Sequence, residues 1–328
     1  MYRLIGMRCR RLVVASVLCA RSIVRSKRLF SIGLLLLLLP VSALAKEVVV
    51  LLDPNIRPYV EALAGFKSTS DANTRIFARK EDGDLSDERA MIGAIRARKP
   101  DQILVIGSEA MRALAGEVTD IPILFVMVLN PRDRLKVMPG NMTGVSMSVA
   151  PERQMKVLSQ LLPEVKRVAV VYDPEQSQDL INRGKKACLS VNQQLFAREV
   201  GSPAEAVEQA KLLLSENHTA YWMIPDQLMR ARDVVRYLFF TAREQNRPLI
   251  GLSDKYVRAG ALFAFTVQNE TLGQQVAELS NRMLAEGKKG HHPIEMARDA
   301  DLSINLKVAS EMGITVPEVL LRQAKVIN

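Results

Sequence analysis

Short apolar runs rich in β-branched residues alternate with longer stretches of helical period from Lys46 to the end of the chain. The pattern predicts strands at residues 48–52, 75–77, 103–106, 123–126, 168–171, 195–200, 220–223, 249–250 and 261–265. Between them, sets such as Ile56, Val60 and Leu63 recur at spacings of four and three, which places each set on one face of a helix. Continuous apolar strands separated by helices are typical of parallel sheets covered on both faces, so we expect an α/β fold.

The sequence Pro-Gly-Asn-Met-Thr-Gly at 139–144 interrupts this alternation near the middle of the chain. A second series of helices and strands begins after it, with a helix that starts near Pro151 and a strand that starts near Lys166. The predicted strands are too many for one small sheet. We therefore expect two α/β lobes of on the order of 100–150 residues each.

The first 45 residues have the order of a secretory signal peptide. They carry eight basic and no acidic residues, then an apolar run with six leucines at 34–39, and then the small-residue sequence Val-Ser-Ala-Leu-Ala before Lys46. Only 17 residues separate Arg28 from Lys46, and Pro40 interrupts them, whereas a membrane span requires about 20 apolar residues. We expect a signal peptide at 1–45, cleavage after Ala45 and a periplasmic mature protein.

The formal net charge of +10 belongs mostly to this leader. The remaining 283 residues carry 37 basic and 35 acidic residues, so the body of the protein is almost neutral. A nucleic-acid-binding protein keeps its basic excess on the folded domain, so we do not expect a nucleic-acid partner. We expect a monomer.

Catalytic and metal-binding motifs are missing from the sequence. It has no G-x-S-x-G, G-x-G-x-x-G or Walker lysine motif, and its histidines are His218, His291 and His292. Cys188 has no histidine near it in the sequence, and we expect it to be a buried bystander. We therefore predict no enzyme, no cofactor and no metal site.

Polar residues follow the predicted strands at their carboxyl ends, where ligands bind in open α/β sheets. Each of them alone could equally be a helix N-cap. Because both lobes offer such residues on the same kind of edge, we predict a ligand site between the lobes. The predicted site residues are Asp53, Asn55, Ser108, Asn130, Asp173, Ser177, Asp226, Gln227, Ser253 and Asp254.

Several segments together resemble a family of ABC-transporter substrate-binding proteins with the type 1 periplasmic-binding fold, which includes tryptophan-binding members. The resemblance runs from about Lys46 to the end of the chain. It rests on the segments 140–146 (GNMTGVS), 161–174 (LLPEVKRVAVVYDP), 256–262 (YVRAGAL), 284–287 (LAEG), 304–307 (INLK) and 312–317 (MGITVP).

This resemblance implies a two-lobed clamshell in which the chain crosses three times between the lobes and the lobes close on a ligand. It implies crossings near 146–149, near Ser253 and between 287 and 303. The expected lobes are then 46–148 with 254–287, and 149–253 with 288–328.

The resemblance also assigns residues. Asp226 stands where tryptophan-binding members have a pocket aspartate, whereas Gln227 and Asp173 stand where such members have asparagine. An additional carboxylate at Asp173 suits a more cationic or more hydroxylated ligand, unless Asp173 only caps the helix that starts near Ser177.

The favoured function is therefore an exported solute-binding protein that captures a small polar or amino-acid-like ligand and delivers it to an inner-membrane ABC permease. The alternative is a periplasmic sensing module that reports ligand occupancy to a membrane signalling protein.

Overall fold

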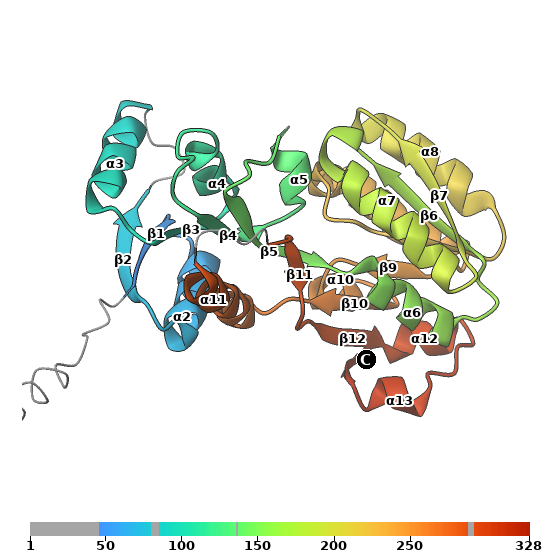
Figure 1. Cartoon of the computed structure of the whole chain (residues 1–328). Helices are drawn as coiled ribbons and strands as arrows, with labels where there is room; N and C mark the ends of the chain where they lie inside the picture. Colours follow the sequence, from blue (N-terminus) through green and yellow to red (C-terminus); the bar gives the residue numbers. More distant parts are fainter. Residues whose placement is uncertain (1–45, 80–84, 136, 288–291) are drawn as a thin grey trace, which may run out of the picture. The chain divides into compact units, whose positions relative to one another are not determined.

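The computed structural model describes residues 46–79, 85–135, 137–287 and 292–328, and its strands form two sheets (Figure 1). Neighbouring strands of the first sheet are all parallel. This sheet has the order β11 (Glu295–Ala297), β5 (Met142–Val149), β4 (Ile123–Val128), β3 (Gln102–Ile106), β1 (Glu47–Leu52) and β2 (Asn73–Ala78).

The second sheet is parallel except at one pair of strands. Its order is β13 (Ala324–Ile327), β12 (Asp301–Asn305), β10 (Phe263–Thr266), β9 (Leu249–Gly251), β8 (Thr219–Trp222), β6 (Arg167–Tyr172) and β7 (Gln194–Glu199). Strands β10 and β12 are antiparallel. Two mostly parallel sheets confirm the predicted α/β class and the two lobes.

Helices cover both faces of each sheet. In the first lobe, Val48, Val50 and Leu52 of β1 pack with α2 and α11, while Val49 and Leu51 on the opposite face pack with α3 and α4. In the second lobe, α6, α7, α12 and α13 cover one face of the sheet and α8 and α9 cover the other. The bounds are α2 (Arg57–Thr69), α3 (Leu85–Arg98), α4 (Ser108–Leu114), α5 (Pro131–Arg134), α6 (Pro151–Leu161), α7 (Pro174–Ser190), α8 (Pro203–Ser215), η1 (Gln227–Arg230), α9 (Arg232–Glu244), α10 (Asp254–Arg258), α11 (Asn269–Glu286), α12 (Leu306–Glu311) and α13 (Glu318–Leu321).

Sheet membership differs from the expected lobe boundaries at two places. Strand β10 follows the expected crossing near Ser253, but it pairs with β9 and β12 of the second sheet. Strand β11 pairs with β5 and so belongs to the first sheet. Within the described ranges, the chain therefore passes between the sheets after β5, between β10 and α11, and between β11 and β12.

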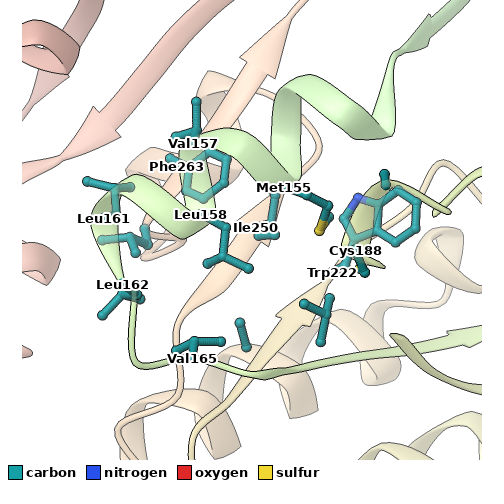
Figure 2. Packing of buried hydrophobic residues seen from close by; sticks show 14 of the residues in the cluster. Met155, Val157, Leu158, Leu161, Leu162, Val165, Cys188, Trp222, Ile250 and Phe263 are labelled. Atoms are coloured by element: carbon teal, nitrogen blue, oxygen red, sulfur yellow. The ribbon is translucent and has the colours of Figure 1, made fainter. Parts of the chain in front are cut away.

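The largest buried side chain of the second lobe, Trp222, lies in a cluster that α6 and α7 cover (Figure 2). Its indole Nε1 donates to Gln154 Oε1 at 2.9 Å, so the ring's one polar atom is satisfied. Cys188 is fully buried in the same cluster, and burial raises the pKa of its thiol to about 12. The position of Cys188 confirms the predicted buried bystander.

Helices α2 and α11 pack closely because glycines stand where they touch (Figure 1). A Cβ atom on Gly65 would overlap the carbonyl oxygen of Glu270, and one on Gly273 would overlap the carbonyl oxygen of Ala62. These close backbone contacts join α2 to α11, which follows β10 of the second sheet. The glycine pair thus fixes how α11, more than 200 residues further along the chain, joins the first lobe.

We predict that Gly65→Ala destabilises the protein by at least about 2 kcal/mol, because the added methyl group meets backbone that cannot move aside. Gly93→Ala in α3 is the matched control, since a Cβ atom there meets nothing within 4 Å. Alanine is the better helix former, so the control should gain up to about 1 kcal/mol. Urea unfolding of both variants measures these changes, and equal effects would contradict the packing account.

Candidate functional site

The first sheet presents polar residues where β1, β3 and β4 end, as expected from the sequence. Asp53 follows β1 and accepts a hydrogen bond from the backbone N–H of Asn55 at 2.8 Å, which closes a turn with Asn55 exposed. Ser108 follows β3 as the first, partly buried residue of α4. Asn130 is the N-cap residue of α5 and is buried.

A β-bulge sets the direction of the chain before Asn130. Residues 125–128 of β4 pair with 144–146 of β5, so β4 has one residue more than its partner across this interval. Met127 takes up the extra length with a φ of 60°, and Asn130 has a φ of 47°. Positive φ is uncommon for residues other than glycine, and bulges are frequent where a side chain must be re-aimed. The bulge turns the end of β4 so that Asn130 leaves the sheet toward the second lobe.

The amide of Asn130 connects the two lobes. Its Nδ2 donates to the carbonyl oxygens of Gln176 at 3.0 Å and of Pro225 at 3.4 Å. Its Oδ1 accepts from Ser148 Oγ at 3.1 Å. One buried side chain therefore joins β4 and β5 of the first sheet to the residues that follow β6 and β8 of the second sheet.

In the second lobe, the buried carboxylate of Asp226 holds two strand ends together. Its Oδ2 accepts from Ser177 Oγ at 2.7 Å and from the backbone N–H of Asp173 at 3.0 Å. Its Oδ1 accepts from the backbone N–H of Leu228 at 3.1 Å and so caps η1. Ser177 is fully buried and Asp226 is 5% exposed. These hydrogen bonds fix the residues after β8 to the start of α7.

Asp173 caps α7 and binds two glutamines. Its Oδ1 accepts from the backbone N–H of Glu175 at 2.9 Å, the N-cap arrangement that the sequence left as one alternative. Its Oδ2 accepts from the side-chain amides of Gln176 at 3.0 Å and Gln227 at 2.6 Å. The structure thus brings together five of the predicted site residues: Asn130, Asp173, Ser177, Asp226 and Gln227.

Ser253 and Asp254 lie at the end of β9, apart from this network. The backbone N–H of Asp254 donates to Thr266 Oγ1 at 2.9 Å, and its carboxylate pairs with Lys325 at 3.2 Å. Ser253 is the N-cap residue of α10, but its side chain makes no capping hydrogen bond. These contacts tie α10 to β10 and β13.

A cavity of about 310 Å³ lies where α5 of the first lobe contacts α7 of the second. It includes charged residues that the sequence analysis missed. Its lining consists of Asn130, Pro131, Arg132, Asp133, Ser146, Ser148, Asp179, Leu180, Arg183, Ile294 and Met296. Of these, Arg132 and Asp133 directly follow Asn130 and Pro131, so extending the search to five residues past the end of β4 would have found them.

Asp133 has a strongly shifted pKa. The pKa of this carboxyl is raised from 3.8 to about 6, mainly by burial. The carboxylates of Asp179 and Asp226 also raise the pKa, whereas the backbone N–H of Asp179 and the guanidinium of Arg134 lower it. Its Oδ2 is buried without a hydrogen-bond partner. Carboxyl groups from both lobes thus influence each other at the α5–α7 contact.

In the described part of the chain, no cluster of three or more histidine, cysteine, aspartate or glutamate side chains could hold a metal ion. In the same residues, no helix combines the length and apolar character that a bilayer span needs.

We predict that Asp226→Asn lowers the free energy of unfolding by about 1–3 kcal/mol, because an amide cannot accept from all three donors and leaves buried groups unpaired. Asp254→Asn is the control on the same sheet edge, where a partly exposed ion pair should contribute less than about 1 kcal/mol. Chemical denaturation compares them. A small effect at Asp226 would mean that its hydrogen bonds do not organise the edge.

We predict that Asp133→Asn stabilises the protein near pH 7.5 by about 1 kcal/mol. This free energy is smaller than the one that corresponds to the whole pKa shift, because water screens the charge of a partly exposed carboxylate. The folded-state pKa lies above the unfolded one, so ionisation above about pH 6 destabilises the native protein, and stability rises as pH falls toward 4. Most of the gain should therefore disappear near pH 4.

Melting curves from about pH 4 to pH 8 measure this difference, with Asp71→Asn as the control substitution at an exposed carboxylate. A gain at Asp133 that does not change with pH would contradict the raised pKa.

The sequence is similar to that of a protein with an assigned ligand. It is 21% identical over 265 residues to the tyrosine-binding protein of Clostridioides difficile strain R20291. The aligned region covers 77% of this chain and 75% of that protein.

The fold is similar to two solved structures. One is an ABC domain in complex with L-Trp from Streptococcus pneumonia, with a TM-score of 0.58, 21% identity, and coverage of 86% of this chain and 100% of that one. The other is the ligand-free, open structure of CD0873, a substrate binding protein with adhesive properties from Clostridium difficile, with a TM-score of 0.64, 18% identity, and coverage of 87% and 99%. At this identity both show the fold alone, the two-lobed type 1 architecture.

The family model of ABC transporter substrate binding proteins matches residues 60–327, which include nearly all of both sheets. The predicted resemblance is thereby confirmed, together with the expectation of a binding protein rather than an enzyme. This chain belongs to the ABC transporter substrate-binding protein family.

Proposed function

We propose that this chain is an exported solute-binding protein of an ABC importer, which captures an amino-acid-like ligand between its two lobes by hinge closure. Family membership supports the general role. The names of the relatives, a tyrosine-binding protein and a complex with L-Trp, favour an amino acid, with an aromatic side chain as the first class to test.

The observation that carries this proposal is the pair of hydrogen bonds from Asn130 to the carbonyl oxygens of Gln176 and Pro225. They join the carboxyl edges of the two sheets, the edges on which α/β proteins bind ligands. A ligand held between these edges adds contacts to both lobes and stabilises the arrangement in which the Asn130 bonds exist. The ten predicted residues on these edges remain our proposed ligand contacts.

The ligand's polar groups have suitable partners on these edges. Carboxylates such as Asp53 and Asp173 accept hydrogen bonds from an ammonium group, while serine hydroxyls and backbone N–H groups at helix starts donate to a carboxylate. The backbone passages between the sheets after β5, after β10 and after β11 provide the hinge in this proposal.

Export and delivery form the second part of the proposal. The signal-like residues 1–45 lie outside the described residues, and we propose that they direct the chain to the periplasm and are removed there. The ligand-loaded protein then docks on an inner-membrane ABC permease. Uptake of the labelled ligand in cells with and without the gene tests this delivery, and equal uptake would argue against it.

We predict that a matching L-amino acid raises the melting temperature and reduces the radius of gyration. A ligand present at about 100 times its Kd adds about 2.7 kcal/mol to the stability of the native state. A thermal-shift screen of the amino acids, followed by small-angle scattering with the best ligand, measures both effects. Stabilisation without compaction would argue against hinge closure.

Two asparagines each donate from the side-chain amide to two backbone carbonyl oxygens, one between the lobes and one within the first lobe, and comparing them sharpens this test. Asn130→Asp should weaken ligand affinity about tenfold or more, because a carboxylate oxygen would face two carbonyl oxygens across the lobes. Asn141 Nδ2 likewise donates to two carbonyls, of Val118 and Ile121, but within the first lobe. Asn141→Asp should therefore lower stability and leave affinity unchanged, and equal affinity losses would contradict the role of Asn130.

We predict that the exported protein begins at Lys46, because the Ala-x-Ala sequence at 43–45 follows the apolar run at the normal spacing for a cleavage site. The intact mass of the protein from the periplasmic fraction measures the cleavage site. A mature product that retains Cys19 would overturn this prediction.

A further inference from the structure

A groove of about 700 Å³ lies on the second lobe, at the sheet edge opposite the candidate site. Its walls are the end of α9, the turn at 258–260 and α12. Helix α9 leads into the start of β9, and the turn at 258–260 leads into the start of β10, so the groove lies at the amino edge of these strands. The proposed amino-acid site lies at the carboxyl edge of the same sheet.

Four cationic side chains line this groove and only one acidic side chain, Glu311, accompanies them. The cations are Arg243, Arg247, Arg258 and Lys307. In the body of the protein as a whole, 37 basic and 35 acidic residues almost balance, so this concentration of one sign is local. Like charges held close together repel each other, and an anion offsets that repulsion.

Three of the four cations have no ion pair among the residues that the structure describes. Arg243, Arg258 and Lys307 are exposed, and none of them forms a salt bridge with another described residue. Arg247, in contrast, is held in place, because its guanidinium donates to the carbonyl oxygen of Leu214 at 3.1 Å and to Asn217 Oδ1 at 2.9 Å. The groove thus has one oriented arginine and three cations that can turn toward a ligand.

Apolar side chains form the rest of the lining. Phe240 is 66% exposed, an unusual position for a phenylalanine on a helix whose buried face is already packed. Phe239 stacks on Tyr256 with a centroid distance of 6.3 Å, which fixes that part of the wall. Val308 and Met312 lie on the α12 side. A ligand that matches this surface has both an anionic group and an apolar part.

We propose that this groove is a second binding site that takes a small organic anion, with its carboxylate, sulfonate or phosphate group at Arg243, Arg258 and Lys307 and its apolar part over Phe240. Guanidinium groups bind such anions through paired, charge-assisted hydrogen bonds. The volume is within the range of small-molecule sites, about 300–1,000 Å³. Because the groove belongs to one lobe only, its occupancy does not require closure of the two lobes.

The near-neutral charge of the remaining body favours a small anion over a polyanion. A nucleic acid or an anionic membrane engages an extended basic surface, whereas the unpaired cations here converge on one groove. The proposed ligand is a free anion and not a lipid head group, and comparison of soluble anions with phosphatidylglycerol vesicles distinguishes the two sources.

The test uses the mature full-length protein with anilinonaphthalene sulfonate as the fluorescent anion and inorganic phosphate as the competitor. We expect saturable binding that weakens with added salt, because screening reduces the attraction between the charges. The Arg243→Ala, Arg258→Ala double variant should bind the probe about tenfold more weakly or worse. Its melting temperature should not change, since neither side chain has an ion pair with another described residue to lose.

Matched variants separate the parts of the proposal. Arg236→Ala removes an exposed arginine of α9 that does not line the groove and should leave the affinity unchanged. Phe240→Ser should weaken the aromatic probe but not phosphate. Asn130→Asp should have no effect, which distinguishes this site from the proposed amino-acid site.

Three outcomes would overturn the proposal. These are non-saturable binding, an affinity that the double variant does not change, and binding only to phosphatidylglycerol vesicles with none to the soluble anions. The last result would identify a membrane-contact surface instead of a small-molecule site.

Discussion

The buried carboxylate of Asp226 is the interaction on which the candidate site depends. It accepts hydrogen bonds from the first turn of α7 and from η1, so the ends of β6 and β8 have one fixed relative position. Leaving such donors unpaired in the interior is costly, which makes the arrangement strongly determined. The carbonyl oxygens that Asn130 of the first lobe contacts belong to Gln176 and Pro225, the residues that directly precede Ser177 and Asp226 in the chain.

Polar contacts of the Asn130 side chain therefore join the two lobes at the carboxyl edges of their sheets. On the first-lobe side, the bulge at Met127 and the positive φ of Asn130 direct the amide outward, and Ser148 holds its oxygen. In the proposed hinge motion, polar contacts of this kind would break and re-form at small cost, because water can replace them. A family of substrate-binding proteins needs that property, since the same surfaces must bind a ligand and release it. The glycine contact between α2 and α11, by comparison, is rigid and lies within the first lobe.

The sequence predicted much of the fold because parallel strands are continuous apolar runs, and all nine expected strands are present. It missed β5 because Gly144, Ser146 and Ser148 make that strand resemble a crossing. Strands β11, β12 and β13 were missed because they are short and partly polar. The expected crossing near Ser253 was displaced because β10 continues the second sheet by pairing with β9 and β12, a long-range contact that local pattern does not contain.

For the candidate site, the polar positions that follow predicted strands were enough to place Asn130, Asp173 and Asp226 on the carboxyl edges of the two sheets. The sequence did not reveal that these side chains bind one another, because their partners lie 46 to 95 residues away. The raised pKa of Asp133 was equally invisible, since it arises from burial against α7 and from carboxylates of the other lobe. The bulge at Met127 could not be recognised because residues 123–128 read as an uninterrupted apolar strand.

The most direct test of this account is a double-mutant cycle on the free energy of unfolding, with Asn130→Asp and Asp226→Asn made singly and together. If the carboxylate of Asp226 holds the carbonyl groups that Asn130 binds, the two changes share one network, and their effects should differ from additivity by about 1 kcal/mol or more. Strictly additive effects, within about 0.3–0.5 kcal/mol, would show that the two sites act independently and would contradict the account.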